Sequence, residues 1–202
     1  MLYYSMREFL AERFHCSGKL LAALNPELDL EALEEGQQLT VPNVVAFDVE
    51  RYVSPEGKAI WSKLVGHGRS GRRVHISKRE RFLTLWEGNR MLRAFPVTVN
   101  AKKTPEGTRE IGEVVPGPVY FRNQSKLDLA AGPNSPVGVI WCQLGDGYGI
   151  HGANNPDSIG RSVSLGCVRM ANWDVVRLAG MVRAGGVVGI GETHLTEEVA
   201  SR

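Results

Sequence analysis

The sequence predicts a mainly β, sandwich-like domain with one C-terminal helix, preceded by a small α-rich segment. Short strand-like runs, separated by Gly and Pro, fill most of the chain after residue 72, and helical periodicity is confined to the two ends. With 202 residues, of which 43% are hydrophobic, the chain can bury one good-sized core plus a satellite module. We expect a module at 1–43, connecting strands at 44–72, the main domain at 73–192 and a tail at 193–202.

The first segment predicts two short helices followed by a strand. Its large apolar residues recur at helical spacing, at Leu10, Phe14, Leu20, Leu21 and Leu24. Asn25-Pro26 ends this run, and a second periodic stretch begins at Leu28 and stops at Gly36. Gln38 to Val41 then predict a short strand that Pro42 ends.

The segment 44–72 predicts two connecting strands and a turn. Phe47 to Val53 and Ala59 to Val65 have strand-like composition, and Pro55-Glu56-Gly57 between them is typical of a turn. Gly66 to Gly71 is glycine-rich, but a strand-like run follows it instead of a helix. It therefore predicts a turn and does not suit a phosphate-binding loop.

The main domain predicts strands until its last thirty or so residues. The predicted strands comprise three within 73–100, with a turn at Glu87-Gly88-Asn89, and further strands at 109–115, 137–144 and 187–190. Asn172 is suited to cap a helix from Trp173 to Arg183, and Gly185-Gly186 is suited to stop it.

Charge and composition name no nucleic-acid, membrane or cofactor partner. Lys plus Arg number 24 and Asp plus Glu 22, so the net charge of +2 is small. The basic stretch 69–93 alternates charged with apolar residues, which favours a hairpin with a solvated face over a nucleic-acid patch. No run of 18 apolar residues predicts a membrane span, and Met1 to Leu10 lacks the pattern of a secretory signal.

The chain has three cysteines, Cys16, Cys142 and Cys167, and they indicate neither a disulfide framework nor a metal site. No C-x-x-C pair and no His pair at metal spacing occurs in the sequence. An odd number of cysteines leaves at least one free thiol, and we expect no cofactor.

The chemistry concentrates between Tyr148 and Asp174. His151 follows a strand-like run and is placed to act as base for the thiol of Cys167, and Arg169 adds positive charge that favours a thiolate. The turn ending Gly166-Cys167 offers backbone N–H groups to a developing oxyanion.

These residues together resemble the signature of the L,D-transpeptidase (YkuD-type) catalytic domain. The signature runs His151-Gly152, a loop with Ile159-Gly160, and then Ser164-x-Gly-Cys-Val-Arg-Met, which ends at Met170. Upstream, Phe95-Pro96-Val97 and Thr104-Pro105-x-Gly107 are also similar, so that the resemblance spans about 74–191.

The resemblance implies a two-step acyl transfer on peptidoglycan stem peptides, outside the cytoplasm. Cys167 forms a thioester, His151 moves the protons, and the carbonyl of Gly152 orients the imidazole. Gly166, Ser164, Arg169 and Tyr148 form the oxyanion and substrate-binding set, in which Arg169 either pairs with a substrate carboxylate or braces the loop. Carbapenems are the usual inhibitors of this family.

One departure from the family pattern and the identity of the acceptor leave alternatives open. Many members carry a second histidine where this chain has Leu165, which puts donor choice and the oxyanion hole in question. Water as acceptor would make the protein an L,D-carboxypeptidase or endopeptidase, and a domain used only as a scaffold would make it a non-catalytic peptidoglycan-binding protein. Asp174 is expected to be a helix-dipole partner instead of a catalytic acid. The sequence does not indicate the oligomeric state.

The first segment resembles the second half of a lysin motif (LysM), a βααβ module that binds N-acetylglucosamine glycans. The resemblance covers Phe9 to Pro42, and the first strand of the motif is missing or degenerate. It implies glycan strands as a further partner, whereas a helical cap on the next domain is the alternative.

Overall fold

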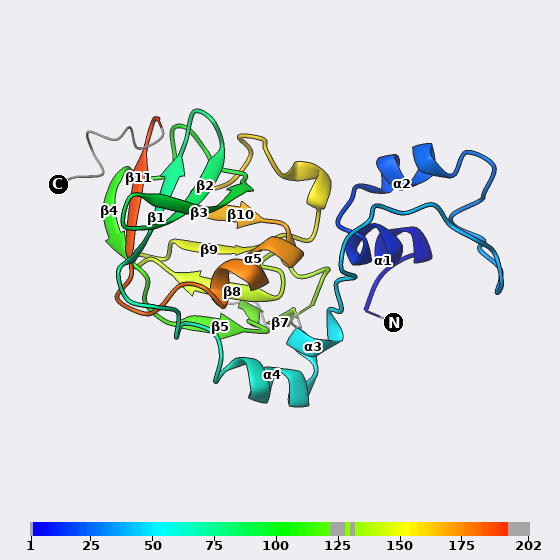
Figure 1. Cartoon of the computed structure of the whole chain (residues 1–202), viewed down its shortest axis with the longest axis horizontal. Helices are drawn as coiled ribbons and strands as arrows, with labels where there is room; N and C mark the ends of the chain where they lie inside the picture. The colour runs from blue at the N-terminus through cyan, green and yellow to red at the C-terminus, as the bar shows by residue number, and fades with distance from the viewer. Residues whose placement is uncertain (1, 122–127, 130–131, 194–202) are drawn as a thin grey trace.

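The structure, a computed structural model, describes residues 2–121, 128–129 and 132–193 and confirms the mainly β fold class (Figure 1). The strands are β1 (Arg72–Ser77), β2 (Phe82–Glu87), β3 (Arg90–Pro96), β4 (Gly107–Glu110), β5 (Val114–Pro116), β6 (Tyr120–Phe121), β7 (Asp128–Leu129), β8 (Ile140–Gln143), β9 (Gly149–Gly152), β10 (Val168–Met170) and β11 (Val187–Gly191). The helices are α1 (Met6–Arg13), α2 (Gly18–Leu24), α3 (Glu50–Val53), α4 (Pro55–Trp61) and α5 (Asn172–Ala179), with a 3-10 turn at Pro156–Ser158. No described helix is long and apolar enough to cross a bilayer.

The larger sheet has the strand order β3-β2-β1-β11-β4. β1 pairs antiparallel with β2 and parallel with β11, so that the start and the end of the main domain lie side by side. Ile76 of β1 lies opposite Leu83 of β2, and both side chains are fully buried. Burial of each such side chain stabilises the fold by about 1.5–3 kcal/mol.

The smaller sheet has the order β10-β9-β8-β5, and α5 packs against β8 and β9. It joins the larger sheet just after β3, where Thr98 forms an antiparallel bridge with Arg169 of β10. The two backbone hydrogen bonds of this bridge measure 2.8 and 2.9 Å. The position of β10 is therefore tied to both sheets.

The N-terminal segment differs from its prediction. Its helical run is split into α1 and α2 at His15, whose φ is +55°, and Ser17 caps α2. The stretch after Leu28 forms turns, and Gln38 to Val41 is not a strand. Buried apolar residues nevertheless give this segment a core of its own, which comprises Ala11, Cys16, Leu21 and Leu30.

The side chain of Asn25 explains why residues 38–41 need no partner strand. Its Oδ1 accepts a hydrogen bond from Thr40 N at 2.7 Å, and its Nδ2 donates to Thr40 O at 2.9 Å. The Nδ2 group also donates to Leu21 O at 2.8 Å. The amide therefore satisfies both backbone groups of Thr40, which a neighbouring strand would otherwise do.

The predicted strands in 44–72 are wrong, because this segment forms α3 and α4. Ser54 is the N-cap of α4 and accepts a hydrogen bond from Gly57 N at 3.0 Å, and Pro55 occupies the first turn. The residues that we interpreted as a turn are therefore the beginning of a helix.

Three boundaries in the main domain also differ. The strand predicted over 109–115 is two strands, β4 and β5, which belong to different sheets. The last helix ends at Ala179, before the predicted Gly185-Gly186 stop, and Ala171 is its N-cap. Asn172 does not cap that helix, because its side chain bonds to other segments. The predicted tail lies outside the described residues from 194 onward.

We predict that Asn25→Ala lowers the free energy of unfolding by about 2–4 kcal/mol, because buried backbone groups lose their partners. Asn25→Asp should cost at least as much, since a carboxylate cannot donate to the two carbonyl oxygens that the amide now contacts. Urea unfolding followed by circular dichroism measures both. Asn43→Ala is the control, because Asn43 is exposed. Equal stability of the Asn25 and Asn43 variants would contradict the role of Asn25.

Candidate active site

One face of the smaller sheet gathers the polar residues that the sequence singled out. Trp141 lies opposite His151 in the β8–β9 pair, and His151 lies opposite Arg169 in the β9–β10 pair. Residues directly opposite each other project from the same face of a sheet. The other face is apolar and fully buried, and its side chains are Ile140, Cys142, Ile150, Val168 and Met170.

Cys167 joins the polar face because it directly precedes β10. Val168 pairs in parallel with Ile150, so extension of the register by one residue sets Cys167 opposite Gly149. Alternation along a strand then puts Cys167 on the same face as Arg169 and His151. The thiol and the imidazole thus project from neighbouring strands, two positions apart.

His151 is held in one orientation. Its ring stacks on that of Trp141, with centroids 5.4 Å apart and an interplanar angle of 17°. Its Nδ1 lies 2.6 Å from the carbonyl oxygen of Gly152. Because a carbonyl can only accept, Nδ1 carries the proton in this bond, which leaves Nε2 as the basic nitrogen.

The imidazole is neutral at physiological pH. Burial lowers the pKa of His151 to about 4, and the positive charge of Arg169 acts in the same direction. The hydrogen bond to Gly152 opposes this shift only in part. A neutral ring with a free Nε2 can accept a proton, as a general base must.

Cys167 is partly exposed, and its thiol lies 3.8 Å from the carbonyl oxygen of Gly147. Burial raises the pKa of this thiol, although the backbone N–H of Gly149 and the charge of Arg169 oppose the shift. Our expectation that neighbouring groups favour a resting thiolate is therefore not met, because desolvation outweighs them. The resting pair is a thiol beside a neutral imidazole.

The turn before Cys167 requires a glycine. Gly166 has φ +136°, and a Cβ at this position would lie 2.6 Å from Cε1 of Tyr148. Ser164 is buried, and its Oγ accepts a hydrogen bond from Gly166 N at 3.4 Å. Tyr148 is held in turn by Arg109, whose guanidinium lies 5.3 Å from the ring centroid. Tyr148 and Ser164 therefore contact the turn itself.

Asn100, which sequence reasoning missed, holds this turn through the backbone of Ser164. Its Nδ2 donates to Ser164 O at 2.8 Å, and its Oδ1 accepts from the backbone N of Lys102 and Lys103 at 3.0 and 2.9 Å. An asparagine that bonds to the backbone two or three residues ahead is a recognised turn former. That local signal could have identified the turn, but not its contact with residue 164.

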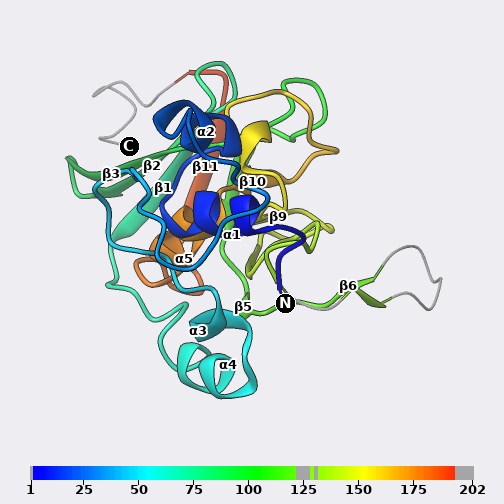
Figure 2. The ribbon, with the colours of Figure 1, turned by 90° about the vertical axis from the view of Figure 1, so that its right-hand side faces the viewer.

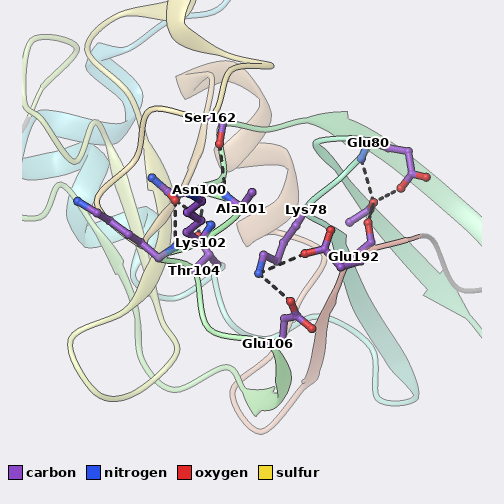
Figure 3. Close-up of polar contacts among 11 residues, drawn as sticks. Lys78, Glu80, Asn100, Ala101, Lys102, Thr104, Glu106, Ser162 and Glu192 are labelled. Carbon is purple, nitrogen blue, oxygen red and sulfur yellow. Dashed lines mark hydrogen bonds and ion pairs between the residues drawn. The ribbon is translucent and has the colours of Figure 1, made fainter.

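The same loop is anchored at its far end by Lys78. The ammonium of this nearly buried residue lies 2.8 Å from a carboxylate oxygen of Glu106 and 3.5 Å from one of Glu192 (Figure 3). Glu106 belongs to the Thr-Pro-x-Gly motif noted in the sequence. The motif therefore connects the loop behind Cys167 to the larger sheet.

Arg169 has no carboxylate within 4 Å among the described residues, and its buried Nε has no hydrogen-bond partner there. Its backbone, by contrast, forms two hydrogen bonds with Thr98.

Two further residues near Cys167 in the sequence, both described by the structure, have no assigned contact with it. Leu165, two positions before Cys167, is 80% exposed. Asp174 is buried and pairs with Arg177 at 3.6 Å, while burial raises its pKa to about 6. The described residues include no group of three potential metal ligands.

Comparison with known proteins identifies relatives over nearly the whole chain. Residues 71–190 match the family YkuD, described as the L,D-transpeptidase catalytic domain. The "Putative L,D-transpeptidase YkuD" of Bacillus licheniformis is 30% identical over 94% of this chain and 99% of its own length. The protein of the same name from Bacillus subtilis is 31% identical over 92% of this chain and 96% of its own.

A solved structure supports the fold alone. The structure titled "Structure of the Ldtfm-avibactam carbamoyl enzyme" is 15% identical, with a TM-score of 0.51, over 62% of this chain and 51% of that chain. At this identity the similarity concerns the arrangement of strands and carries no statement about side chains.

We predict that Gly166→Ala destabilises the protein more than Gly160→Ala does, by about 1–3 kcal/mol, because only the first methyl group meets a neighbour. Gly160 also has positive φ, at +83°, but nothing lies within 4 Å of its Cβ position. Tyr148→Ala should reduce the cost of Gly166→Ala in the double variant. Thermal unfolding measures these differences, and equal costs for the two glycine variants would contradict the proposed contact.

Proposed function

Because the chain belongs to the L,D-transpeptidase catalytic domain family, we propose that it transfers peptidoglycan stem peptides through a thioester at Cys167. The observation that carries the proposal is the shared sheet face, which brings the Cys167 thiol beside a neutral, oriented His151. Action on peptidoglycan would take place outside the cytoplasm.

In the first step, the Sγ of Cys167 attacks the carbonyl carbon of the third stem residue as Nε2 of His151 takes the thiol proton. The tetrahedral intermediate then collapses, the bond to the terminal D-alanine breaks, and His151 returns the proton to the leaving amine. Because both groups start neutral, the proton moves during the attack and not before it.

In the second step, an amine from a neighbouring stem attacks the thioester carbonyl and loses its proton to His151. The thiolate leaves, and the proton returns to Cys167. Water in place of the amine would give the carboxypeptidase or endopeptidase reaction, which shares the first step. No contact in the described residues favours one acceptor over the other.

Arg169 is the proposed partner of a substrate carboxylate. Its guanidinium lacks an acidic partner among the described residues, and it projects from the face that carries His151. Gly166 and Ser164 shape the turn that would present backbone N–H groups to the oxyanion, and Tyr148 supports it. The exposed Leu165 adds an apolar surface where many relatives carry histidine.

We also propose that residues 1–43 form a module next to the catalytic domain at 73–192. Four of its buried residues make a separate core, whereas Tyr3 belongs to the main core. Glycan binding by this module stays a prediction of the lysin-motif resemblance. The connecting segment 44–72 contributes Phe47, Val49 and Val65 to the main core, and it therefore packs as part of the catalytic unit.

We predict that Cys167→Ala abolishes turnover of a soluble stem tetrapeptide and leaves the thermal unfolding temperature within a few degrees, because the thiol adds little packing beyond alanine. Cys142→Ala, in the buried core, should retain turnover. Mass analysis of the products distinguishes crosslinked peptide, trimmed tripeptide and no change, which correspond to transpeptidase, carboxypeptidase and non-catalytic function. Activity in Cys167→Ala would end the nucleophile assignment.

We further predict that a carbapenem acylates the protein once, at Cys167, because its strained amide presents a carbonyl and ring opening disfavours reversal. Intact mass should rise by one drug mass, lost on hydroxylamine treatment, and should map to residues 162–169. Cys16 and Cys142 are internal controls, since both thiols are buried whereas Cys167 is partly exposed.

The rate of this acylation should depend on pH through His151. As pH falls through its pKa of about 4, the imidazole becomes protonated and can no longer accept the thiol proton. The rate should therefore stay nearly constant from about pH 7 to pH 5 and fall below that. A midpoint near 6.5, the ordinary value for histidine, would contradict the buried environment described here.

A further inference from the structure

The side chain of Asn172 joins three segments at the base of the active site. It is fully buried at the start of α5, its Nδ2 donates to Ala153 O at 3.2 Å, and its Oδ1 accepts from Val139 N at 3.2 Å. The Nδ2 group also donates to Oε1 of Glu12 at 2.6 Å. Glu12 belongs to α1, so this bond links the N-terminal segment to the catalytic domain.

Asn172 is packed directly against the residue that orients the catalytic imidazole. A Cβ at Gly152 would lie 2.1 Å from Asn172 Oδ1, and one at Gly138 would lie 2.2 Å from it. The amide therefore occupies the space that side chains at both positions would need. The carbonyl of Gly152 in turn accepts the Nδ1–H of His151. A shift of Asn172 would thus move the acceptor that fixes the tautomer of His151.

Glu12 holds the same amide, because its Oε1 accepts a hydrogen bond from Nδ2 of Asn172. Only 3% of its surface is exposed, and burial raises its pKa to about 7. A carboxylate is costly to bury unless it is hydrogen-bonded, and an apolar residue here would leave the Asn172 donor short of a partner. The carboxyl group of Glu12 therefore serves as the hydrogen-bond acceptor for Asn172 and does more than fill space.

Further contacts beside this bond hold the N-terminal segment against the catalytic domain: Phe9 of α1 packs against the main core, and Phe47 N donates to Arg13 O at 2.7 Å. His15 stacks on Trp173, the neighbour of Asn172, with centroids 5.3 Å apart and an interplanar angle of 7°. A cavity of about 350 Å3 lies between α1, Glu12 included, and the loop 154–157. Figures 1 and 2 show α1 next to the segment from which α5 starts. Glu12 therefore contacts Asn172, and Asn172 in turn packs against Gly152 at the end of β9.

We infer that Glu12 is a positioning residue, which acts through Asn172 and the Gly152 carbonyl to hold His151 in its Nδ1–H orientation. The N-terminal segment then supports catalysis through the bond of Glu12 to Asn172, whether or not this segment binds glycan. This inference rests on the proposed role of His151 as base. It predicts that the loss of the Glu12 acceptor changes the state of His151 while substrate affinity is retained.

The test compares Glu12→Ala and Glu12→Asp with Glu12→Gln. Alanine removes the acceptor, and aspartate withdraws it by one methylene, whereas glutamine keeps an oxygen that can accept from Asn172. Glu8→Ala, one turn earlier on α1, is the matched control because Glu8 bonds to Tyr4 N and not to Asn172. Long-range 1H–15N spectra report the tautomer of His151, and steady-state kinetics with a soluble stem tetrapeptide report kcat and KM.

We expect kcat to fall on the order of 10-fold in Glu12→Ala and Glu12→Asp, with KM within about two-fold, because small misplacement of a catalytic group slows chemistry more than binding. Their spectra should show loss of the pure Nδ1–H form of His151. Glu12→Gln and Glu8→Ala should match the wild-type protein in both measurements. If Glu12→Ala fails to fold, Glu12→Asp, which keeps a carboxyl group, decides the outcome.

An unchanged His151 spectrum in Glu12→Ala or Glu12→Asp would overturn the inference, even if kcat fell. Loss of the Nδ1–H form of His151 in Glu12→Gln would overturn it as well. The spectra need no turnover, so they test the link independently of the reaction. A wild-type protein without turnover but with a Glu12-dependent His151 tautomer would sink the proposed function and uphold the link.

Discussion

The parallel pairing of β9 with β10 is the constraint on which the site depends. Val168 opposite Ile150 sets the register, and both side chains are buried in the apolar core on the far side of the sheet. A slip by one residue would turn every side chain of β10 to the other face. The packing of the apolar face thus determines that Cys167 and His151 share the polar one.

Burial has opposite effects on the two reactive groups, yet both effects favour the neutral form. Desolvation raises the pKa of the Cys167 thiol and lowers that of the His151 imidazole, so the two groups do not exchange a proton at rest. A protonated thiol is a weak nucleophile. In the proposed mechanism, reactivity depends on an imidazole that is already oriented when a carbonyl arrives. The contacts of Trp141 and Gly152 with the His151 ring provide that orientation.

The strands of the larger sheet could be predicted from the sequence because their signals are local. Alternation and the turn at Glu87-Gly88-Asn89 identified β1 to β3, whose pairing is between neighbours in the chain. The helix at Pro55 also had a local signal, a serine followed by proline, but the strand-like composition of the segment outweighed it in our interpretation.

The residues of the candidate site could be proposed from their motif. The residues that hold them in place from distant parts of the chain could not be predicted. Asn100 contacts Ser164 across 64 residues, and Glu12 contacts Asn172 across 160. No periodicity or spacing connects positions so far apart in the chain. The raised pKa of Cys167 likewise depends on how deeply the whole fold buries the thiol, which the identity of its sequence neighbours does not reveal.

At Asn172, local helix capping and long-range tertiary contacts compete for the same side chain. At the start of a helix, an asparagine ordinarily stabilises the free backbone N–H groups, and its loss as a cap costs about 1 kcal/mol. Here α5 has no side-chain cap, because its N-cap residue is Ala171, and the amide of Asn172 is turned inward to Val139, Ala153 and Glu12. Three buried hydrogen bonds offset the missing cap. The same sequence feature thus predicts a local helix start correctly to within one residue and hides the tertiary contact for which the side chain is used, and such local inconsistencies are expected next to functional sites.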